Sequence, residues 1–209
     1  MKTQVLKRLA FPFVISLASF AGCHSGSKDS TTVADSANKQ GIAKTDSAAK
    51  AQAGVADSSI EANKKLSEDA SKFLVKSYEA GLYEIQLSQL AATNGLDADV
   101  KRLAAAMVPA HTAINSKISA IAASANFVLP AAVNVDHQKD LQDMGKLTGP
   151  DFDKKYINTI VDGHKSAVDD YKDAYKNLGD GDTKIFAAET LPKIQDHLAM
   201  AKKVQDRIK

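Results

Sequence analysis

The sequence predicts an all-α protein, an antiparallel four-helix bundle in which a long connection containing a short helix joins the second and third helices. Three observations support this fold class. Four amphipathic segments of about 28 residues carry apolar side chains three and four residues apart. Capping residues and helix stops bracket these segments. The links within the first pair and within the last pair are short, which favours two helical hairpins.

The first two helices are expected over about residues 67–94 and 97–125. Ser67 and Asp97 are typical N-cap residues, and an Asn-Gly pair between the two segments is typical of a helix stop. Pro109 lies inside the second helix, where it removes one backbone hydrogen bond and is expected to bend the axis.

The second half begins with a connection that carries a short helix over about residues 136–147. A Thr-Gly-Pro run ends that helix, and proline in the first turn starts the third long helix, expected over residues 150–178. Asp180 or Asp182 is the expected N-cap of the fourth helix. Lysines and an arginine near its end suit the negative end of a helix dipole.

Residues 1–22 have the basic start and the short apolar stretch of a secretory signal peptide. Ala-Gly before Cys23 resembles a lipobox, so we expect a lipoprotein signal and a lipidated Cys23. Residues 23–66 are polar and lack aromatic side chains, which predicts a disordered tether to a bundle over residues 67–209. The residue after Cys23 is His24 and not an aspartate, which favours sorting of the lipoprotein to the outer membrane, with the domain in the periplasm or at the surface.

Composition excludes several classes of function. The 27 basic and 25 acidic residues are interspersed and leave a net charge of +2, so no nucleic-acid partner is expected. Lipidation would consume the single cysteine, which leaves no thiol for zinc or redox chemistry. The chain has neither Ser–His–Asp spacing nor a glycine-rich phosphate loop. We therefore expect a non-enzymatic protein whose identified partner is the membrane, through the lipid anchor.

One set of polar residues falls on the apolar stripes of the four long helices. Glu84 lies on the first stripe, His111 on the second, His164 on the third and His197 on the fourth. Counted from the hairpin turns at 1.5 Å per residue, their depths differ by only about 3–6 Å, which side chains can span. The sequence therefore predicts one cluster of four potential metal ligands.

Three motifs carry a resemblance to a known family. They are Met107-Val108-Pro109-Ala110-His111, Phe152-Asp153-Lys154-Lys155-Tyr156 with His164 eight residues on, and Leu191-Pro192 with His197-Leu198. Over residues 66–209 the chain resembles the bacterial family called domain of unknown function 4142. The resemblance implies a ferritin-like bundle in an exported, often outer-membrane, protein, and it implies no established activity. Members usually carry Asp where this chain has Ala110.

The ligand set excludes one metal chemistry and leaves two classes of function open. A di-iron site needs a Glu three residues before a His on two helices, but Val108 precedes His111 and Ile194 precedes His197 at that spacing. One class is a non-enzymatic, lipid-anchored envelope bundle for binding or stress protection, with metal-free core histidines. The alternative is a metal-binding or redox bundle that holds one Zn, Fe, Ni or Cu ion, or a haem between two histidines.

Three further expectations concern the environment of polar groups. Burial should hold the pKa of all three bundle histidines below the usual value of about 6.5. Glu84 should be the only carboxylate on an inner, apolar stripe, whereas His24 and His137 should be exposed. The five tyrosines should lie in the core as hydrogen-bond partners.

Overall fold

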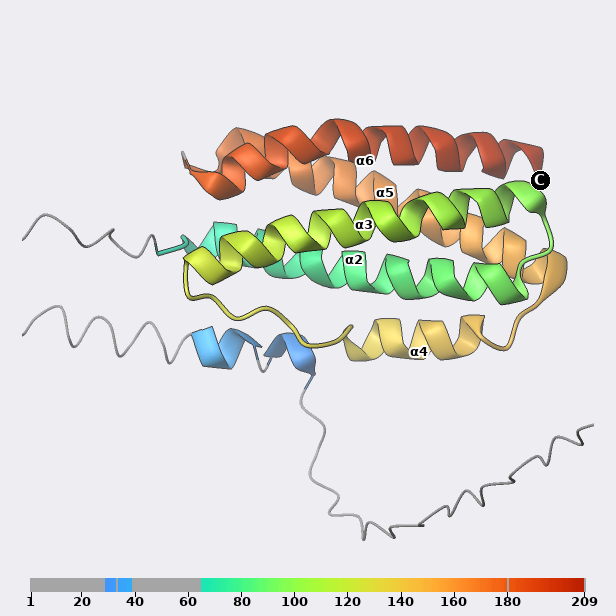
Figure 1. The fold of residues 1–209 in the computed structure, drawn as a ribbon, viewed down its shortest axis with the longest axis horizontal. Helices are drawn as coiled ribbons and strands as arrows, with labels where there is room; N and C mark the ends of the chain where they lie inside the picture. Colours follow the sequence, from blue (N-terminus) through green and yellow to red (C-terminus); the bar gives the residue numbers. More distant parts are fainter. Residues whose placement is uncertain (1–28, 33, 39–64, 180, 209) are drawn as a thin grey trace, which may run out of the picture.

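A computed structural model describes residues 29–32, 34–38, 65–179 and 181–208, and all regular structure in these ranges is helical (Figure 1). The long helices are α2 (Glu68–Asn94), α3 (Ala98–Ser124), α5 (Gly149–Asn177) and α6 (Asp182–Arg207), and the short helix is α4 (Val135–Met144). The predicted all-α helical bundle is thereby confirmed. The predicted signal peptide and Cys23 lie outside the described residues.

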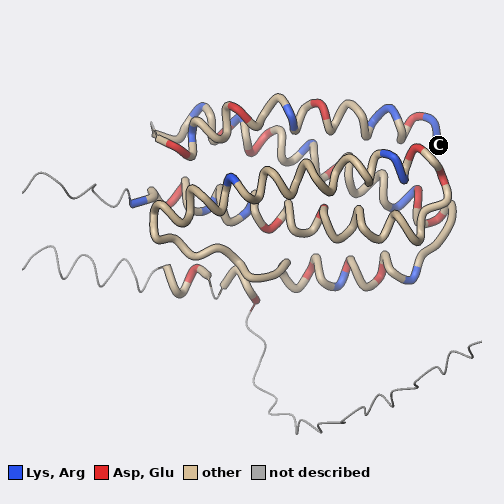
Figure 2. Tube along the Cα trace, viewed as in Figure 1, with Lys and Arg blue, Asp and Glu red and all other residues tan. Residues whose placement is uncertain are grey.

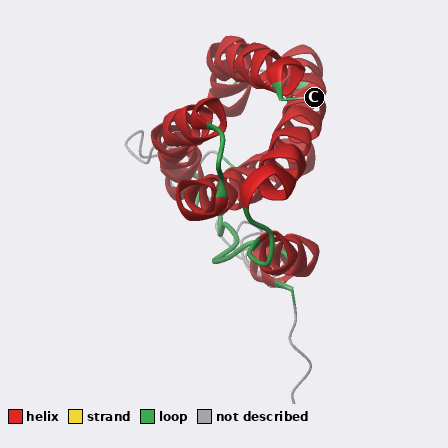
Figure 3. Ribbon diagram, turned by 90° about the vertical axis from the view of Figure 1, so that its right-hand side faces the viewer, coloured by secondary structure: helices red, strands yellow, loops and turns green. Residues whose placement is uncertain are grey.

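Two helical hairpins, α2–α3 and α5–α6, pack side by side, with α2 against α5 and α3 against α6. Viewed along their length, the long helices surround a common axis and α4 lies outside the ring (Figure 3). From the end of α3 the chain crosses the length of the bundle to the start of α5, and α4 packs on α2 within this crossing. This crossing is the predicted long connection. Charges of both signs are spread along the helices (Figure 2).

The helix starts follow the expected capping chemistry with one exception. The Ser67 hydroxyl accepts a hydrogen bond from the Ala70 N–H at 3.2 Å, and the Asp97 carboxylate accepts from the backbone N–H groups of Asp99 and Val100. At α6 the prediction of an aspartate cap is wrong. Gly181 occupies the N-cap position with φ of 157°, a backbone conformation that disfavours side chains, and Asp182 lies in the first turn of the helix.

The apolar core consists of two clusters stacked along the bundle. One, near the α2–α3 turn, is built around residues such as Leu87, Met107 and Tyr156. The other, near the opposite end, includes Phe73 and Ile118. In α3, α5 and α6 the residues of the two clusters are separated by a short gap that contains the predicted His, and in α2 Glu84 lies at the inner edge of the first cluster, between Tyr83 and Leu87. The fold therefore places a polar layer between two apolar halves.

A buried carboxylate ties the two hairpins together at one end. Asp153, in the first turns of α5, is 4% exposed and accepts hydrogen bonds from the backbone N–H groups of Leu96 and Asp97, at 3.1 and 2.7 Å. These N–H groups belong to the link between α2 and α3. The start of the second hairpin is thus bonded to the turn of the first.

A short helical stretch, residues 30–32 and 34–38, contacts the crossing between α3 and α4. The Asn38 side chain donates to the Val128 carbonyl at 2.9 Å and accepts from the Val128 N–H at 2.8 Å, and Ser30 donates to the Ala132 carbonyl at 2.6 Å. This stretch lies within the predicted tether, most of which is outside the described residues. In the described part of the chain, no helix combines the length and the apolar character needed to cross a membrane.

Candidate metal centre

The polar layer brings together the four side chains that counting along the helices placed at similar depth. They are Glu84 from α2, His111 from α3, His164 from α5 and His197 from α6, exposed by 7%, 4%, 0% and 7%. The three imidazole rings form a triangle with centroids 5.2 to 5.4 Å apart. One potential ligand nitrogen from each ring lies within 4.8 Å of the other two.

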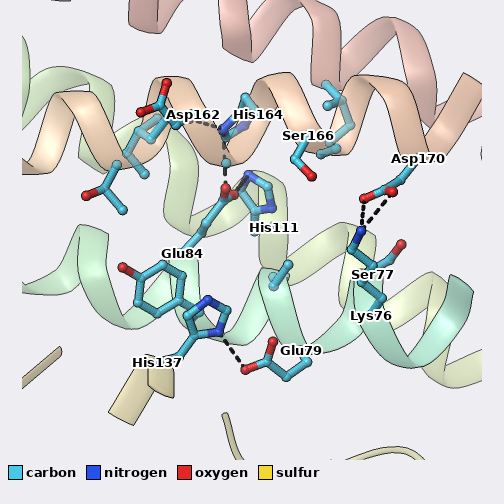
Figure 4. A pocket seen from close by; sticks show the side chains of 18 of the residues that line it. Lys76, Ser77, Glu79, Glu84, His111, His137, Asp162, His164, Ser166 and Asp170 are labelled. Carbon is cyan, nitrogen blue, oxygen red and sulfur yellow. Dashed lines mark hydrogen bonds and ion pairs between the residues drawn. The ribbon is translucent and has the colours of Figure 1, made fainter. Parts of the chain in front are cut away.

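Glu84 contacts two of the three histidines (Figure 4). Its Oε2 lies 2.8 Å from His111 Nε2 and its Oε1 lies 3.3 Å from His164 Nδ1. Burial alone would raise the pKa of the Glu84 carboxyl, but positive charge on His111 and His164 outweighs it and lowers that pKa to about 2. Glu84 is therefore a carboxylate inside the core.

The histidines respond to this carboxylate in different ways. Burial, together with charge repulsion from His111 and His164, lowers the pKa of His197 to about 4, in the expected direction. The expectation of a lowered pKa is wrong for His111. Burial acts to lower its pKa, yet the Glu84 charge beside the ring more than compensates and raises it. The error came from treating burial as the only influence on that ring.

The tautomer of His164 follows from its neighbours. Nδ1 lies 3.0 Å from the Ile160 carbonyl oxygen, one turn earlier in α5. Because a carbonyl oxygen can only accept, Nδ1 carries the hydrogen and the neutral ring presents a lone pair at Nε2. This is the arrangement by which proteins orient a metal-binding imidazole.

Three buried ring nitrogens have no aligned hydrogen-bond partner among the described residues: Nε2 of His111, Nε2 of His164 and Nδ1 of His197. His111 Nε2 is close to Glu84, but the ring is not oriented for a hydrogen bond to it. A metal-free structural role would require each nitrogen to have a partner, since a buried unsatisfied polar group costs about 1–3 kcal/mol. Three imidazole nitrogens and a carboxylate form a ligand set for one transition-metal ion.

Two carboxylates outside the predicted inner stripes are buried in addition to Glu84. Asp153 is occupied by the α2–α3 link, and Glu79, 5% exposed, lies toward α4. Neither belongs to the histidine triangle. Within the described residues, the cluster therefore has one carboxylate, too few for a ferritin-type di-iron site.

The Glu79 side chain forms a second polar cluster that sequence reasoning missed. Its Oε1 accepts from the Asn134 N–H and lies 2.8 Å from His137 Nδ1. The His137 ring stacks on Tyr83 with centroids 4.0 Å apart, and the Tyr83 hydroxyl donates to Asp140. His137 was expected to be exposed, but its side chain is 32% exposed. His24 lies outside the described residues.

Of the five tyrosines, Tyr83, Tyr156 and Tyr171 are buried as predicted, and Tyr156 and Ser88 form a hydrogen bond of 3.0 Å. Tyr175 contradicts the prediction because it is 52% exposed. The tyrosines of the core thus stabilise the packing around the polar layer.

The polar layer approaches the surface on two faces. A cleft of about 590 Å³ between α2 and α5 is lined by Glu84, His111 and His164. A groove of about 620 Å³ between α3 and α6 is lined by His197. The cluster is buried by its own helices and is flanked by an opening on either side.

These features define an all-α bundle with a histidine and glutamate cluster at its centre. The family model described as Domain of unknown function (DUF4142) matches residues 55–204, and the chain belongs to this family. The crystal structure of a DUF305 fragment from Deinococcus radiodurans is similar, with a TM-score of 0.61 and 9% identity over 68% of this chain and 99% of that one. This likeness concerns the fold alone. The comparison with curated proteins gives no match.

Proposed function

We propose that this protein binds one divalent transition-metal ion in the core of its bundle, through His111, His164, His197 and Glu84. The observation that carries the proposal is that each of the three rings has a buried nitrogen without an aligned hydrogen-bond partner among the described residues, while one potential ligand nitrogen of each ring lies within 4.8 Å of the other two. An ion between them would satisfy all three at once. Of the two classes that the sequence left open, this geometry favours the metal-binding bundle.

The charge distribution also favours a cation. The Glu84 carboxylate is ionised in a region with apolar clusters on either side. In the metal-free protein a proton on a neighbouring imidazole is the available counter-charge, as the raised pKa of His111 reflects. A divalent ion would replace that proton, and Glu84 Oε2 would become the fourth ligand while Oε1 continues to face His164 Nδ1.

The donor atoms restrict the identity of the ion. Imidazole nitrogens suit zinc, copper, nickel and iron, whereas magnesium and calcium prefer sites built from oxygen. Metal–nitrogen bonds of about 2.0–2.1 Å place tetrahedral ligand nitrogens roughly 3.3 Å apart, so the ring nitrogens, now within 4.8 Å of one another, would have to approach by up to roughly 1.5 Å. One carboxylate and three imidazoles give tetrahedral coordination, or an open site if Glu84 stays outside the coordination sphere.

We propose the cell envelope as the location of this site. The basic and apolar leader and the Ala-Gly-Cys sequence ending at Cys23 support export and lipid anchoring. A Cys23→Ser variant should leave the membrane fraction and incorporate no labelled fatty acid. A variant that remains bound to membranes, together with a wild type that takes up no lipid, would contradict the anchor.

Metal binding can be tested by measuring stability with and without metal. The full chain, purified without a histidine tag, should become more stable by about 2.7 kcal/mol when zinc is present at about 100 times its dissociation constant. His111→Ala, His164→Ala and His197→Ala should each remove most of this increase, and His137→Ala should retain it. If Zn²⁺, Cu²⁺, Ni²⁺ and Fe²⁺ all leave the melting temperature unchanged and none copurifies, the proposed function is wrong.

A further inference from the structure

The two openings beside the histidine cluster differ in charge. The lining of the α2–α5 cleft carries two lysines and five carboxylates, which are Glu79, Glu84, Asp140, Asp162 and Asp170. The α3–α6 groove carries Lys117 and Lys193 against Asp196, and Lys117 also pairs with Glu189 at 3.2 Å, so this groove is close to neutral. An opening lined by negative charge raises the local concentration of cations, and a neutral opening does not.

The ion pairs within the cleft leave its negative character in place. Lys76 bonds to Asp170 at 2.7 Å and Lys155 lies 4.0 Å from Asp140, so these two pairs cancel (Figure 4 shows the first). Glu79 is paired with His137, and Asp162 is 73% exposed beside Lys165, which does not line the cleft. The remaining carboxylate, Glu84, lies at the inner end beside the histidines.

A glycine opens the wall between this cleft and the cluster. Gly163 is exposed in the middle of α5, directly before His164, and a Cβ placed on it would lie 3.2 Å from Glu84 Oε1. A larger side chain at this position would cover the carboxylate. A glycine inside a helix costs about 1 kcal/mol relative to alanine, so a missing side chain here is not explained by helix stability.

We propose that divalent cations reach the centre through the α2–α5 cleft, past Gly163, and meet Glu84 as their first ligand. This inference rests on the proposed function, since it assigns the route by which the ion arrives. The cation loses part of its hydration shell to the Glu84 carboxylate, then binds His111 and His164, which also line the cleft. His197, on the far side at the α3–α6 groove, completes the site.

The route is tested by the rate at which the full chain takes up Co²⁺, followed by stopped-flow absorbance of the cobalt–imidazole complex. Asp162→Lys should slow uptake about three- to tenfold at low ionic strength, and the difference should shrink in about 0.5 M salt because the charge is at the surface. Lys193→Glu, the matched change at the other opening, should leave the rate unchanged. All three proteins should bind the same final amount of Co²⁺.

A second pair of variants tests the opening itself. Gly163→Leu should slow uptake tenfold or more, whereas Ala113→Leu, which narrows the α3–α6 groove, should have no effect. The charge variants decide the question even if Gly163→Leu fails to fold. Equal rates in wild type and Asp162→Lys, or faster uptake in Lys193→Glu, would overturn the route while leaving metal binding intact. A wild type that takes up no Co²⁺, Zn²⁺ or other first-row ion would overturn both proposals.

Discussion

Helix α2 supplies two glutamates that each lie 2.8 Å from a histidine on another helix, Glu84 with His111 and Glu79 with His137. In the Glu79 pair the carboxylate also accepts from a backbone N–H, and the His137 ring stacks on Tyr83. In the Glu84 pair the ring nitrogen is not aligned for a hydrogen bond, and two further histidines have buried nitrogens without partners in the part of the chain that the structure describes. The distance within a pair therefore says little about its role. The two pairs differ in whether the buried polar atoms around them have hydrogen-bond partners. This difference separates the structural Glu79 pair from the proposed binding site at Glu84.

The largest expected difference between the two pairs is the response to metal. Loss of a carboxylate in the outer shell of a metal site lowers affinity by about 10- to 100-fold, and loss of the proposed Glu84 ligand should lower it by at least as much. At an ion concentration of about 100 times the wild-type dissociation constant, a 100-fold loss in Glu84→Ala would reduce the stabilisation from about 2.7 to about 0.4 kcal/mol. Glu79→Ala should keep the full increase. Urea unfolding with and without zinc measures the stabilisation of each variant. If zinc stabilises the two variants equally, the Glu84 pair does not differ from the Glu79 pair in metal binding.

The next effect concerns stability without metal. Glu79→Ala leaves the Asn134 N–H and His137 without their acceptor, and this should cost about 1–3 kcal/mol. Glu79→Gln is the matched control because its amide oxygen can still accept from the Asn134 N–H. Urea midpoints of the metal-free proteins are the measurement. A midpoint unchanged in Glu79→Ala would mean that the α4 contact contributes nothing to the fold.

Two histidines, His197 in the central cluster and His137 beside Glu79, should also respond to pH in opposite directions. His197, with a folded pKa of about 4, binds protons less readily than the unfolded chain does, whose histidine pKa is about 6.5. Its stabilising contribution is therefore present above pH 6.5 and decreases as the pH falls toward 4. The hydrogen bond to Glu79 raises the pKa of His137, so its contribution is complete below pH 6.5 and is lost as the pH rises through the folded pKa.

Metal-free His197→Gln and His137→Gln proteins test this contrast. His197→Gln should flatten the loss of stability between pH 6.5 and 5, and His137→Gln should remove a loss above pH 6.5. Urea midpoints from pH 5 to 8 give both slopes. Identical slopes in wild type and both variants would show that the pKa of His197 is not lowered and that the pKa of His137 is not raised.

The smallest effect is expected for an exposed ion pair of similar length. Lys76 and Asp170 join α2 to α5 at 2.7 Å, but the lysine side chain is 61% exposed. Such pairs contribute about 0–1 kcal/mol, so Lys76→Ala should change stability by less than Glu79→Ala does. A loss as large as that of Glu79→Ala in the same urea experiment would show that burial does not control the strength of these pairs.

The long helices and the four residues of the polar layer could be predicted because each is a local property of one amphipathic segment. Ser67 and Asp97 cap their helices through residues three or fewer positions away. His111 and His197 occupy positions where the three- and four-residue spacing requires an inward side chain. Counting from the turns was then enough to place them at one depth.

The Glu79 cluster could not be predicted because Glu79 lies off the inner stripe of α2. It is buried only because the connection brings α4 over that side of the helix, with His137 opposite. No periodicity in the sequence specifies where a short helix in a long connection will pack. The raised pKa of His111 was missed for a related reason, since it depends on the contact with Glu84 and not on burial alone.

The bond from Asp153 to the α2–α3 link has a consequence for the axial alignment of the ligands. Glu84 lies 12 residues before Leu96 and His164 lies 11 residues after Asp153, so both are about 17–18 Å from the same bonded point along their helices. The same hydrogen-bonded contact therefore fixes the axial position of both hairpins. A slip of α5 along α2 by one helical turn would break this bond and would also carry His164 past Glu84. The alignment of the histidine and glutamate cluster is set at the end of the bundle, about three helical turns away from the proposed ligands.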